Sequence, residues 1–177
     1  MKRKGNHSHY ENAVEAYLRE KNIPYIATNE GQKVVYNDSK IKNFDLVLPG
    51  KMMHMVDIKG RKFGYPPSTP KNFFENWILQ DDAESLKVWN SVSSNNQQAY
   101  LLYAYCCPDS GDPLPKCFEG NTFFFEGRAY AFFMISIQDY LSNSKRRSLK
   151  PPTVCVSRKL FSNLLRPLSL ILIENKI

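Results

Sequence analysis

The sequence predicts an α/β protein in which a mixed central β-sheet is flanked by helices. Apolar residues recur at helical spacing between residues 10 and 18. Two shorter apolar runs, residues 44–48 and 52–58, follow and have the length of strands. A nearly uninterrupted apolar run at residues 98–106 is typical of a central strand that is buried on both faces.

Local signals predict the other elements. Pro24 ends the first helix, because the residue before a proline avoids helical geometry, and residues 24–28 then form the first strand. Later elements are expected as a helix at 81–92, a hairpin of strands 122–126 and 130–137 that turns at Gly127, a helix at 137–143, a strand at 154–156 and a helix at 157–165. Asp81 or Asp82 lies near the start of its helix, where the helix dipole favours acids. The final apolar run, LSLILI, has the length of a strand.

The most informative pattern is the triplet Asp57-Ile58-Lys59 inside the second apolar run. Strand alternation places Asp57 and Lys59 on the same face. Asp45 lies in the preceding apolar run, where an unpaired charge is costly to bury. Binding of a divalent cation is one reason for such acids, since Mg²⁺ takes oxygen ligands. A short triplet of this kind also occurs as a solvated ion pair on exposed strands, so its context decides.

The context resembles a known nuclease core. A helix that carries a glutamate, then a strand with Asp45, then Asp57-Ile58-Lys59 resembles the PD-(D/E)xK superfamily, which includes type II restriction enzymes and archaeal Holliday-junction resolvases. The segments AVEAYLREKNIPYIA, IKNFDLVLPG and HMVDIKGRK, with later segments as far as about Leu168, resemble more closely a small bacterial family found in planctomycetes and named for a HYAxFE-type motif. The resemblance implies a three-layer, restriction-endonuclease-like core.

The resemblance also implies a metal site. Glu15, Asp45 and Asp57 would be carboxylate ligands of one or two Mg²⁺ (or Mn²⁺) ions, with the Ile58 carbonyl as a further ligand. Resolvase-like enzymes place their helix glutamate close to the position of Glu11, which lies one helical turn before Glu15, so both glutamates remain candidates.

Lys59 would be the catalytic lysine of a metal-dependent DNA endonuclease. As an ammonium group it would orient the attacking water or stabilise negative charge on the phosphate, and as a neutral amine it would help to deprotonate that water. Because Lys59 is not itself a metal ligand, we expect Lys59→Ala to leave folding and metal binding nearly intact.

The charge of the chain favours a nucleic-acid partner. There are 24 Lys and Arg residues against 17 Asp and Glu residues, for a formal net charge of +7. The basic residues fall into clusters expected to contact DNA: Lys59, Arg61 and Lys62 at the triplet, and Lys145, Arg146, Arg147 and Lys150 farther on. Residues 1–8, which include MKRK, are expected to form a mobile basic arm. The loop GYPPSTP, residues 64–70, follows the first cluster and is a candidate for the rim of a substrate cleft.

The length and the remaining composition limit the other possibilities. The 177 residues are expected to form one domain, residues 1–177. No signal peptide and no apolar run of membrane-spanning length are present, so a cytoplasmic protein with reduced cysteines is expected. The four cysteines include no C-x-x-C pair of the kind that binds zinc. A homodimer is plausible, since cleavage of both strands usually needs two sites.

Two other functions fit the same fold. One is a DNA-binding or scaffold protein that has lost catalytic activity, and the other is a nuclease that acts on RNA. The intact set of two acids and a lysine argues against loss of activity, because a degenerate site would be free to lose those residues.

Overall fold

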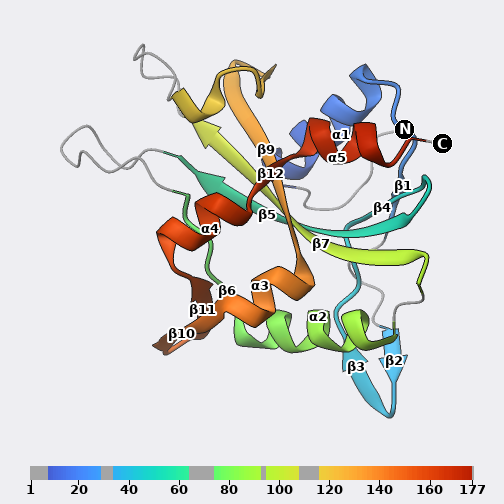
Figure 1. The fold of residues 1–177 in the computed structure, drawn as a ribbon, viewed down its shortest axis with the longest axis vertical. Coiled ribbons are helices and arrows are strands. Elements are labelled where there is room, and N and C mark those ends of the chain that lie inside the picture. The colour runs from blue at the N-terminus through green and yellow to red at the C-terminus, as the bar shows by residue number, and fades with distance from the viewer. Residues whose placement is uncertain (1–7, 29–33, 64–73, 93–94, 108–115, 177) are drawn as a thin grey trace.

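A mixed β-sheet between two layers of helices forms the centre of the protein (Figure 1). The structure is a computed structural model that describes residues 8–28, 34–63, 74–92, 95–107 and 116–176. The basic arm, apart from Ser8, and the loop at 64–70 lie outside the described residues. No helix in the described part of the chain is long and apolar enough to span a membrane.

The central sheet has the order β1-β4-β5-β7-β9-β12, with β8 also paired to β9. Its strands are β1 (Ile26–Ala27), β4 (Leu46–Leu48), β5 (Met53–Lys62), β7 (Gln97–Cys107), β8 (Thr122–Phe125), β9 (Arg128–Ser136) and β12 (Arg166–Pro167). β5 and β7 are parallel, and the other neighbours are antiparallel. β7 is buried from Ala99 to Cys107, which confirms the prediction of a central strand.

The helices cover the two faces of this sheet. They are α1 (His9–Glu20), α2 (Gln80–Val92), α3 (Ile137–Asn143), α4 (Arg158–Leu164) and α5 (Leu168–Glu174), with a 3₁₀ turn at Lys116–Phe118. One core contains buried residues of α1 and α5 together with Val56 and Ile58 of β5. The other contains buried residues of α2, α3 and α4 together with Met55 of β5. Alternate residues of β5 therefore face opposite helical layers, and the predicted three-layer arrangement is confirmed.

Two small sheets extend from this core. β2 (Val34–Tyr36) and β3 (Ser39–Ile41) form a hairpin whose two turn residues, Asn37 and Asp38, both have positive φ. β10 (Ser144–Leu149), β11 (Pro152–Val156) and β6 (Ile78–Leu79) form a three-stranded sheet beside α2. The sequence predicted β11 but not β10, since the basic run KRRSLK does not alternate between apolar and polar residues as a strand usually does.

The run LSLILI has the length of a strand, but in the structure it forms the helix α5. Leu168, Ile171 and Leu172 are buried, whereas Ile173 is 61% exposed. Spacings of three and four residues put the buried side chains on one helical face, which packs into the core shared with α1. In a short apolar run, only the available packing partner separates a helix from a strand.

Candidate active site

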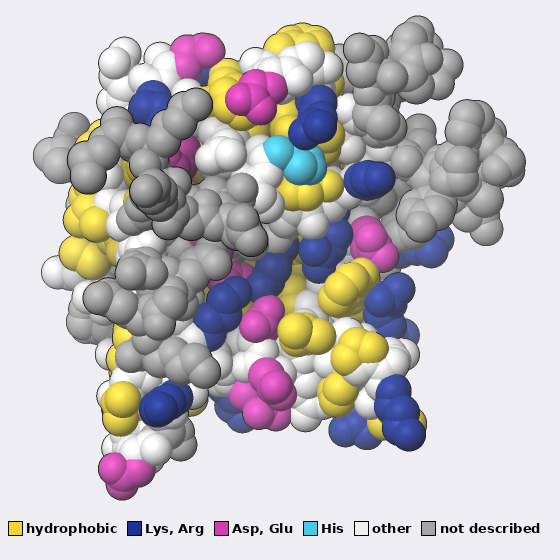
Figure 2. All heavy atoms as spheres, turned by 180° about the vertical axis from the view of Figure 1, so that it is seen from behind, with side chains coloured by type: hydrophobic (Ala, Val, Ile, Leu, Met, Phe, Trp, Pro, Cys, Tyr) yellow, Lys and Arg dark blue, Asp and Glu magenta, His cyan; other side chains and the backbone are white. Residues whose placement is uncertain are grey.

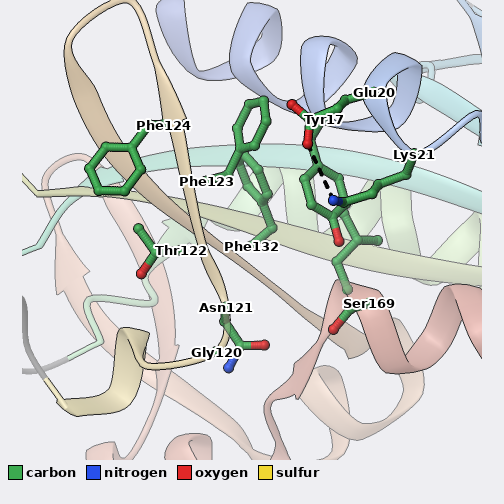
Figure 3. A pocket seen from close by; sticks show the side chains of 11 residues that line it. Tyr17, Glu20, Lys21, Gly120, Asn121, Thr122, Phe123, Phe124, Phe132 and Ser169 are labelled. Carbon is green, nitrogen blue, oxygen red and sulfur yellow. Dashed lines mark hydrogen bonds and ion pairs between the residues drawn. The ribbon is translucent and has the colours of Figure 1, made fainter.

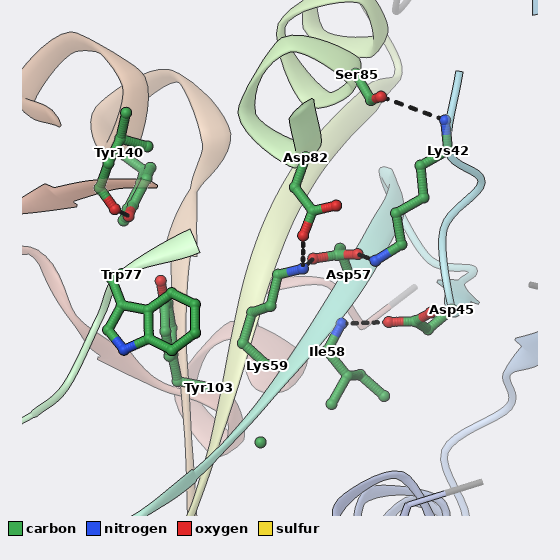
Figure 4. A network of polar contacts seen from close by, with 12 residues as sticks. Lys42, Asp45, Asp57, Ile58, Lys59, Trp77, Asp82, Ser85, Tyr103 and Tyr140 are labelled. Carbon is green, nitrogen blue, oxygen red and sulfur yellow. Dashed lines mark hydrogen bonds and ion pairs between the residues drawn. The ribbon is translucent and has the colours of Figure 1, made fainter. Parts of the chain in front are cut away.

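β5 brings Asp57 and Lys59 to the same face, as strand alternation predicted. The Lys59 Nζ lies 2.8 Å from Asp57 Oδ2, and the two residues are 8% and 1% exposed. Neighbouring Ile58 packs into the α1 core, so Asp57 and Lys59 point toward the layer of α2 (Figure 4). The pair is a buried ion pair, which differs from the solvated pair that a D-x-K triplet can also form.

Asp45 joins this pair from the end of the neighbouring strand. The β4–β5 ladder has its last paired residues at Leu46 and Val56, and Asp45 N–H extends it by one bond to the Val56 carbonyl, at 3.0 Å. Beyond that point, the Ile58 N–H donates to Asp45 Oδ2 at 2.6 Å. This hydrogen bond places the Asp45 carboxylate, which is 8% exposed, beside the peptide that follows Asp57. The end of one strand therefore turns a carboxylate toward the acidic residue of the next.

Two further residues, which the sequence did not single out for this site, complete the charge network. Lys42 Nζ lies 2.8 Å from Asp57 Oδ1, and Asp82 Oδ2, in the first turn of α2, lies 2.6 Å from Lys59 Nζ. Asp82 was noted only as an acid near a helix start, and Lys42 carries no sequence signal. Figure 4 shows how Asp57 lies between the two lysines.

The network keeps Asp57 ionised. Burial by itself raises the pKa of the Asp57 carboxyl, but Lys59 and Lys42 outweigh it and hold this pKa below its ordinary value. Burial lowers the pKa of the Lys42 ammonium, but Asp57 outweighs that effect and raises the pKa above its ordinary value. Both groups are therefore charged near neutral pH.

The donor chemistry of the site fits a hard cation. Asp45, Asp57 and Asp82 carry three negative charges against the two positive charges of Lys42 and Lys59. Mg²⁺ is commonly bound by one or two carboxylates together with waters and substrate phosphates. Asp45 and Asp57 supply carboxylate oxygens of this kind, and Asp45 lies within hydrogen-bond distance of the peptide that follows Asp57. Among the described residues, no three His, Cys, Asp or Glu side chains are close enough to hold one ion by themselves.

The structure does not bring Glu15 to this network. Glu15 lies on α1, which packs on the opposite face of the sheet from the side chains of Asp57 and Lys59. Its carboxylate accepts hydrogen bonds from Arg19 and from the Tyr25 hydroxyl, at 3.1 and 3.0 Å. Glu11, on the same helix, accepts a hydrogen bond from Ser8 at 3.2 Å.

The first basic cluster differs in exposure from residue to residue. Lys62 is exposed at the end of β5, but Arg61 is half-buried against the Trp77 ring, with its Cζ 4.5 Å from the ring centroid. Arg61 also donates to the carbonyl oxygens of Gly60 and Trp77. Arg61 therefore ties β5 to the segment before β6, and Lys62 presents its charge to solvent.

The second basic cluster lies on the β10–β11 hairpin. Lys145, Arg146, Arg147 and Lys150 are all exposed there. The Arg147 guanidinium also lies 5.4 Å from the Trp77 ring centroid, which joins the hairpin to the segment held by Arg61. Figure 2 shows Lys and Arg side chains gathered on the side where β10 and β11 lie, and others mixed with carboxylates across the middle of the same face.

A separate cavity of about 470 Å³ lies between α1, β8 and α5 (Figure 3). Aromatic side chains, among them Tyr17, Phe123 and Phe132, line one part of it, and Lys21 and Ser169 line another. These aromatic residues pack with the α1 core, so the cavity is on the opposite side of the sheet from Asp57 and Lys59. The charge network is therefore a site of its own.

The arrangement of the strands and helices is similar to that of a known class of DNA-processing protein. One similar solved structure is that of Hjc, a Holliday junction resolvase from the archaeal hyperthermophile Archaeoglobus fulgidus. The TM-score is 0.51 at 12% sequence identity, over 96% of this chain and 95% of that chain. Neither a family model nor a curated protein sequence matches the chain. At this identity the likeness shows the fold, and it confirms the restriction-endonuclease-like core expected from the resemblance to resolvases.

Proposed function

We propose that the protein is a nuclease that hydrolyses phosphodiester bonds in DNA and depends on Mg²⁺ or Mn²⁺. The observation that carries the proposal is the meeting of Asp45, Asp57 and Lys59 at adjacent strands of a sheet with the fold of a Holliday junction resolvase. Buried acids beside a buried lysine are costly to maintain, and catalysis is a function that such a group can serve.

Asp45, Asp57 and the Ile58 carbonyl would hold the cation. When bound, it would supply neutralisation of charge on the phosphate and activation of the attacking water. The resemblance to the nuclease family alone adds Glu15 or Glu11 as a third carboxylate, and either would have to reach the cation from α1, which lies on the opposite face of the sheet from Asp57 and Lys59 in this structure. Calorimetric titration with Mn²⁺ on Glu15→Gln and Glu11→Gln would identify which of them contributes.

Lys59 would act on the phosphate or the attacking water as a positioned ammonium group. Its contacts with Asp57 and Asp82 fix the nitrogen, so no ordering is needed when the substrate arrives. Asp82 would be a positioning residue that acts through Lys59.

Lys62 and the β10–β11 hairpin would contact DNA phosphates outside the site. Their exposed charges suit the sequence-independent part of nucleic-acid binding. The proposal also takes residues 1–177 as one domain with a basic arm at its start, and a homodimer as the form that would cleave two strands. The finer resemblance to the HYAxFE-motif family is part of the same proposal.

The test is a cleavage assay on labelled plasmid, linear duplex, single-stranded and four-way-junction DNA, and on RNA, with and without Mg²⁺ or Mn²⁺. Cleavage of at least one DNA by the wild type, only with metal, is expected. Asp57→Asn should abolish it, and Lys51→Met, which removes an exposed lysine before β5, should not. Binding without cleavage under every condition would favour a scaffold function, and cleavage of RNA alone would favour the RNA nuclease.

A further inference from the structure

The buried carboxylate of Asp57 already has a cation on each oxygen. Lys42 Nζ and Lys59 Nζ each lie 2.8 Å from one of them. A divalent cation that binds Asp57 needs one of these oxygens, and an ammonium group at the same oxygen repels it strongly in a poorly solvated site. One lysine must therefore move when the cation binds.

The surroundings of the two lysines show which one can move. The Lys59 side chain is 9% exposed and is held by two carboxylates, those of Asp57 and Asp82. The Lys42 side chain is 39% exposed and hydrogen-bonds to Asp57. Lys42 can therefore transfer its ammonium group to water at a smaller desolvation cost than Lys59.

The backbone at Lys42 is anchored independently of its ammonium group. Its N–H donates to Ser85 Oγ at 3.3 Å, and its carbonyl accepts from Trp89 Nε1 at 2.9 Å. Both partners lie on α2, and the Trp89 ring packs on Phe44, with centroids 5.0 Å apart. The side chain can thus leave Asp57 while the chain path into Asp45 stays in place.

We propose that Lys42 is an internal cation that occupies Asp57 in the metal-free protein and is displaced when a divalent cation binds. The inference rests on the proposed function and adds a regulatory residue to the same site. Without metal, the Lys42 ammonium group helps to neutralise the buried Asp57 carboxylate. Because it competes with the divalent cation for that carboxylate, it raises the cation concentration needed for binding.

The test is calorimetric titration with Mn²⁺ at pH 8, without DNA, on wild type, Lys42→Met, Lys42→Arg and Lys40→Met. Lys42→Met should bind Mn²⁺ about tenfold more tightly or better, since the competing charge is gone. Lys42→Arg keeps the charge and should bind nearly like the wild type. Lys40→Met removes an exposed lysine two residues away on β3 and controls for the change in net charge.

Thermal unfolding provides a second measurement that does not need activity. Lys42→Met should unfold at a lower temperature than the wild type without metal, and Mn²⁺ should raise its Tm by more. If this variant is poorly folded without metal, Lys42→Gln takes its place, because it removes the charge but can still donate to Asp57.

Each outcome has a distinct meaning. Equal Mn²⁺ affinity in wild type and Lys42→Met, with binding in both, overturns the role of Lys42 and leaves the proposed nuclease intact. Absence of binding in all variants overturns the metal site of the proposed function. Mn²⁺ binding by Lys42→Met but not by the wild type would support the proposal, since it would mean that Lys42 blocks the site until it leaves Asp57.

Discussion

At the scale of single residues, the burial of Lys59 changes what its substitution will do. The expectation that Lys59→Ala leaves folding nearly intact does not fit a side chain that is 9% exposed and paired with two carboxylates. Loss of one partner leaves a buried charge uncompensated, and such losses commonly cost about 3–5 kcal/mol. Lys59 therefore contributes to the free energy of unfolding as well as to the proposed chemistry.

Lys59→Met should lower both the free energy of unfolding and the rate of DNA cleavage. We expect the free energy of unfolding to fall by about 3–5 kcal/mol, measured by urea denaturation. The rate of DNA cleavage should fall about a hundredfold to a thousandfold, measured at a temperature at which circular dichroism shows the variant folded. Lys51→Met is the matched control and should change neither.

Lys59→Arg separates two roles of the lysine. Arginine keeps the positive charge but does not release a proton near neutral pH. Partial recovery of cleavage relative to Lys59→Met would indicate an electrostatic role, and equal loss would indicate proton transfer. Full activity in Lys59→Met would contradict the proposed mechanism.

At the scale of elements, the contact between α1 and β5 is set by a glycine next to Lys59. A Cβ on Gly60 would lie 2.2 Å from the Tyr10 ring, so the first turn of α1 packs directly on the β5 backbone. No larger residue fits without movement of the helix or the ring.

Gly60→Ala should therefore lower the free energy of unfolding by about 1–3 kcal/mol, a usual cost of overpacking. Tyr10→Ala removes the obstructing ring, so the double variant should be more stable than the sum of the two single losses predicts. Urea denaturation of the four proteins in this cycle measures the difference. Additive losses would show that Tyr10 does not cause the penalty.

The β10–β11 hairpin is the element best suited to test DNA binding apart from catalysis. Arg147 also contacts Trp77 and lies 3.8 Å from Glu75, so its substitution disturbs local packing. Arg146 is exposed, and no ion pair or ring contact joins it to the described residues.

Arg146→Glu should weaken DNA binding to a similar degree for all sequences. If Arg146 contacts one phosphate of a duplex, the slope of log K against log salt should become shallower by about 0.9. Fluorescence anisotropy over a series of salt concentrations measures this slope. Lys51→Glu changes the net charge equally and should keep the wild-type slope, and an unchanged slope in Arg146→Glu would mean that this residue is only solvated.

At the scale of the whole molecule, the charge network makes stability depend on pH. The native pKa of Asp57 is depressed, with Lys59 and Lys42 outweighing the effect of burial. The unfolded chain then binds a proton more readily than the native protein. The stabilisation from Asp57 is complete above the unfolded pKa of about 3.9 and is lost as the pH falls through the native value.

Asp57→Asn removes this titration and should have a flatter dependence of stability on pH below about pH 4. Urea denaturation over an acidic pH series measures the slopes for wild type and variant, so the lower absolute stability of the variant does not affect the comparison. Parallel slopes would show that Asp57 does not contribute to acid unfolding.

The sequence by itself determined the helices and strands that follow from local periodicity. It also determined which residues share a face of the same strand. Helical spacing predicted α1, and an uninterrupted apolar run predicted β7 as a central strand. The pairing of Asp57 with Lys59 followed from the two-residue repeat of a strand, which holds wherever the strand lies in the fold. Asp45 was found because a charge inside an apolar run needs a partner.

Only the tertiary structure decided which distant residues complete the site and which stay away. Asp82 reaches it from the first turn of α2, and Lys42 reaches it from a segment whose backbone is hydrogen-bonded to α2. Glu15 faces away because α1 covers the other side of the sheet. LSLILI became a helix because the α1 core offered a surface to a helical face. Local sequence fixes which way a side chain points from its own element, whereas long-range packing fixes what it meets there.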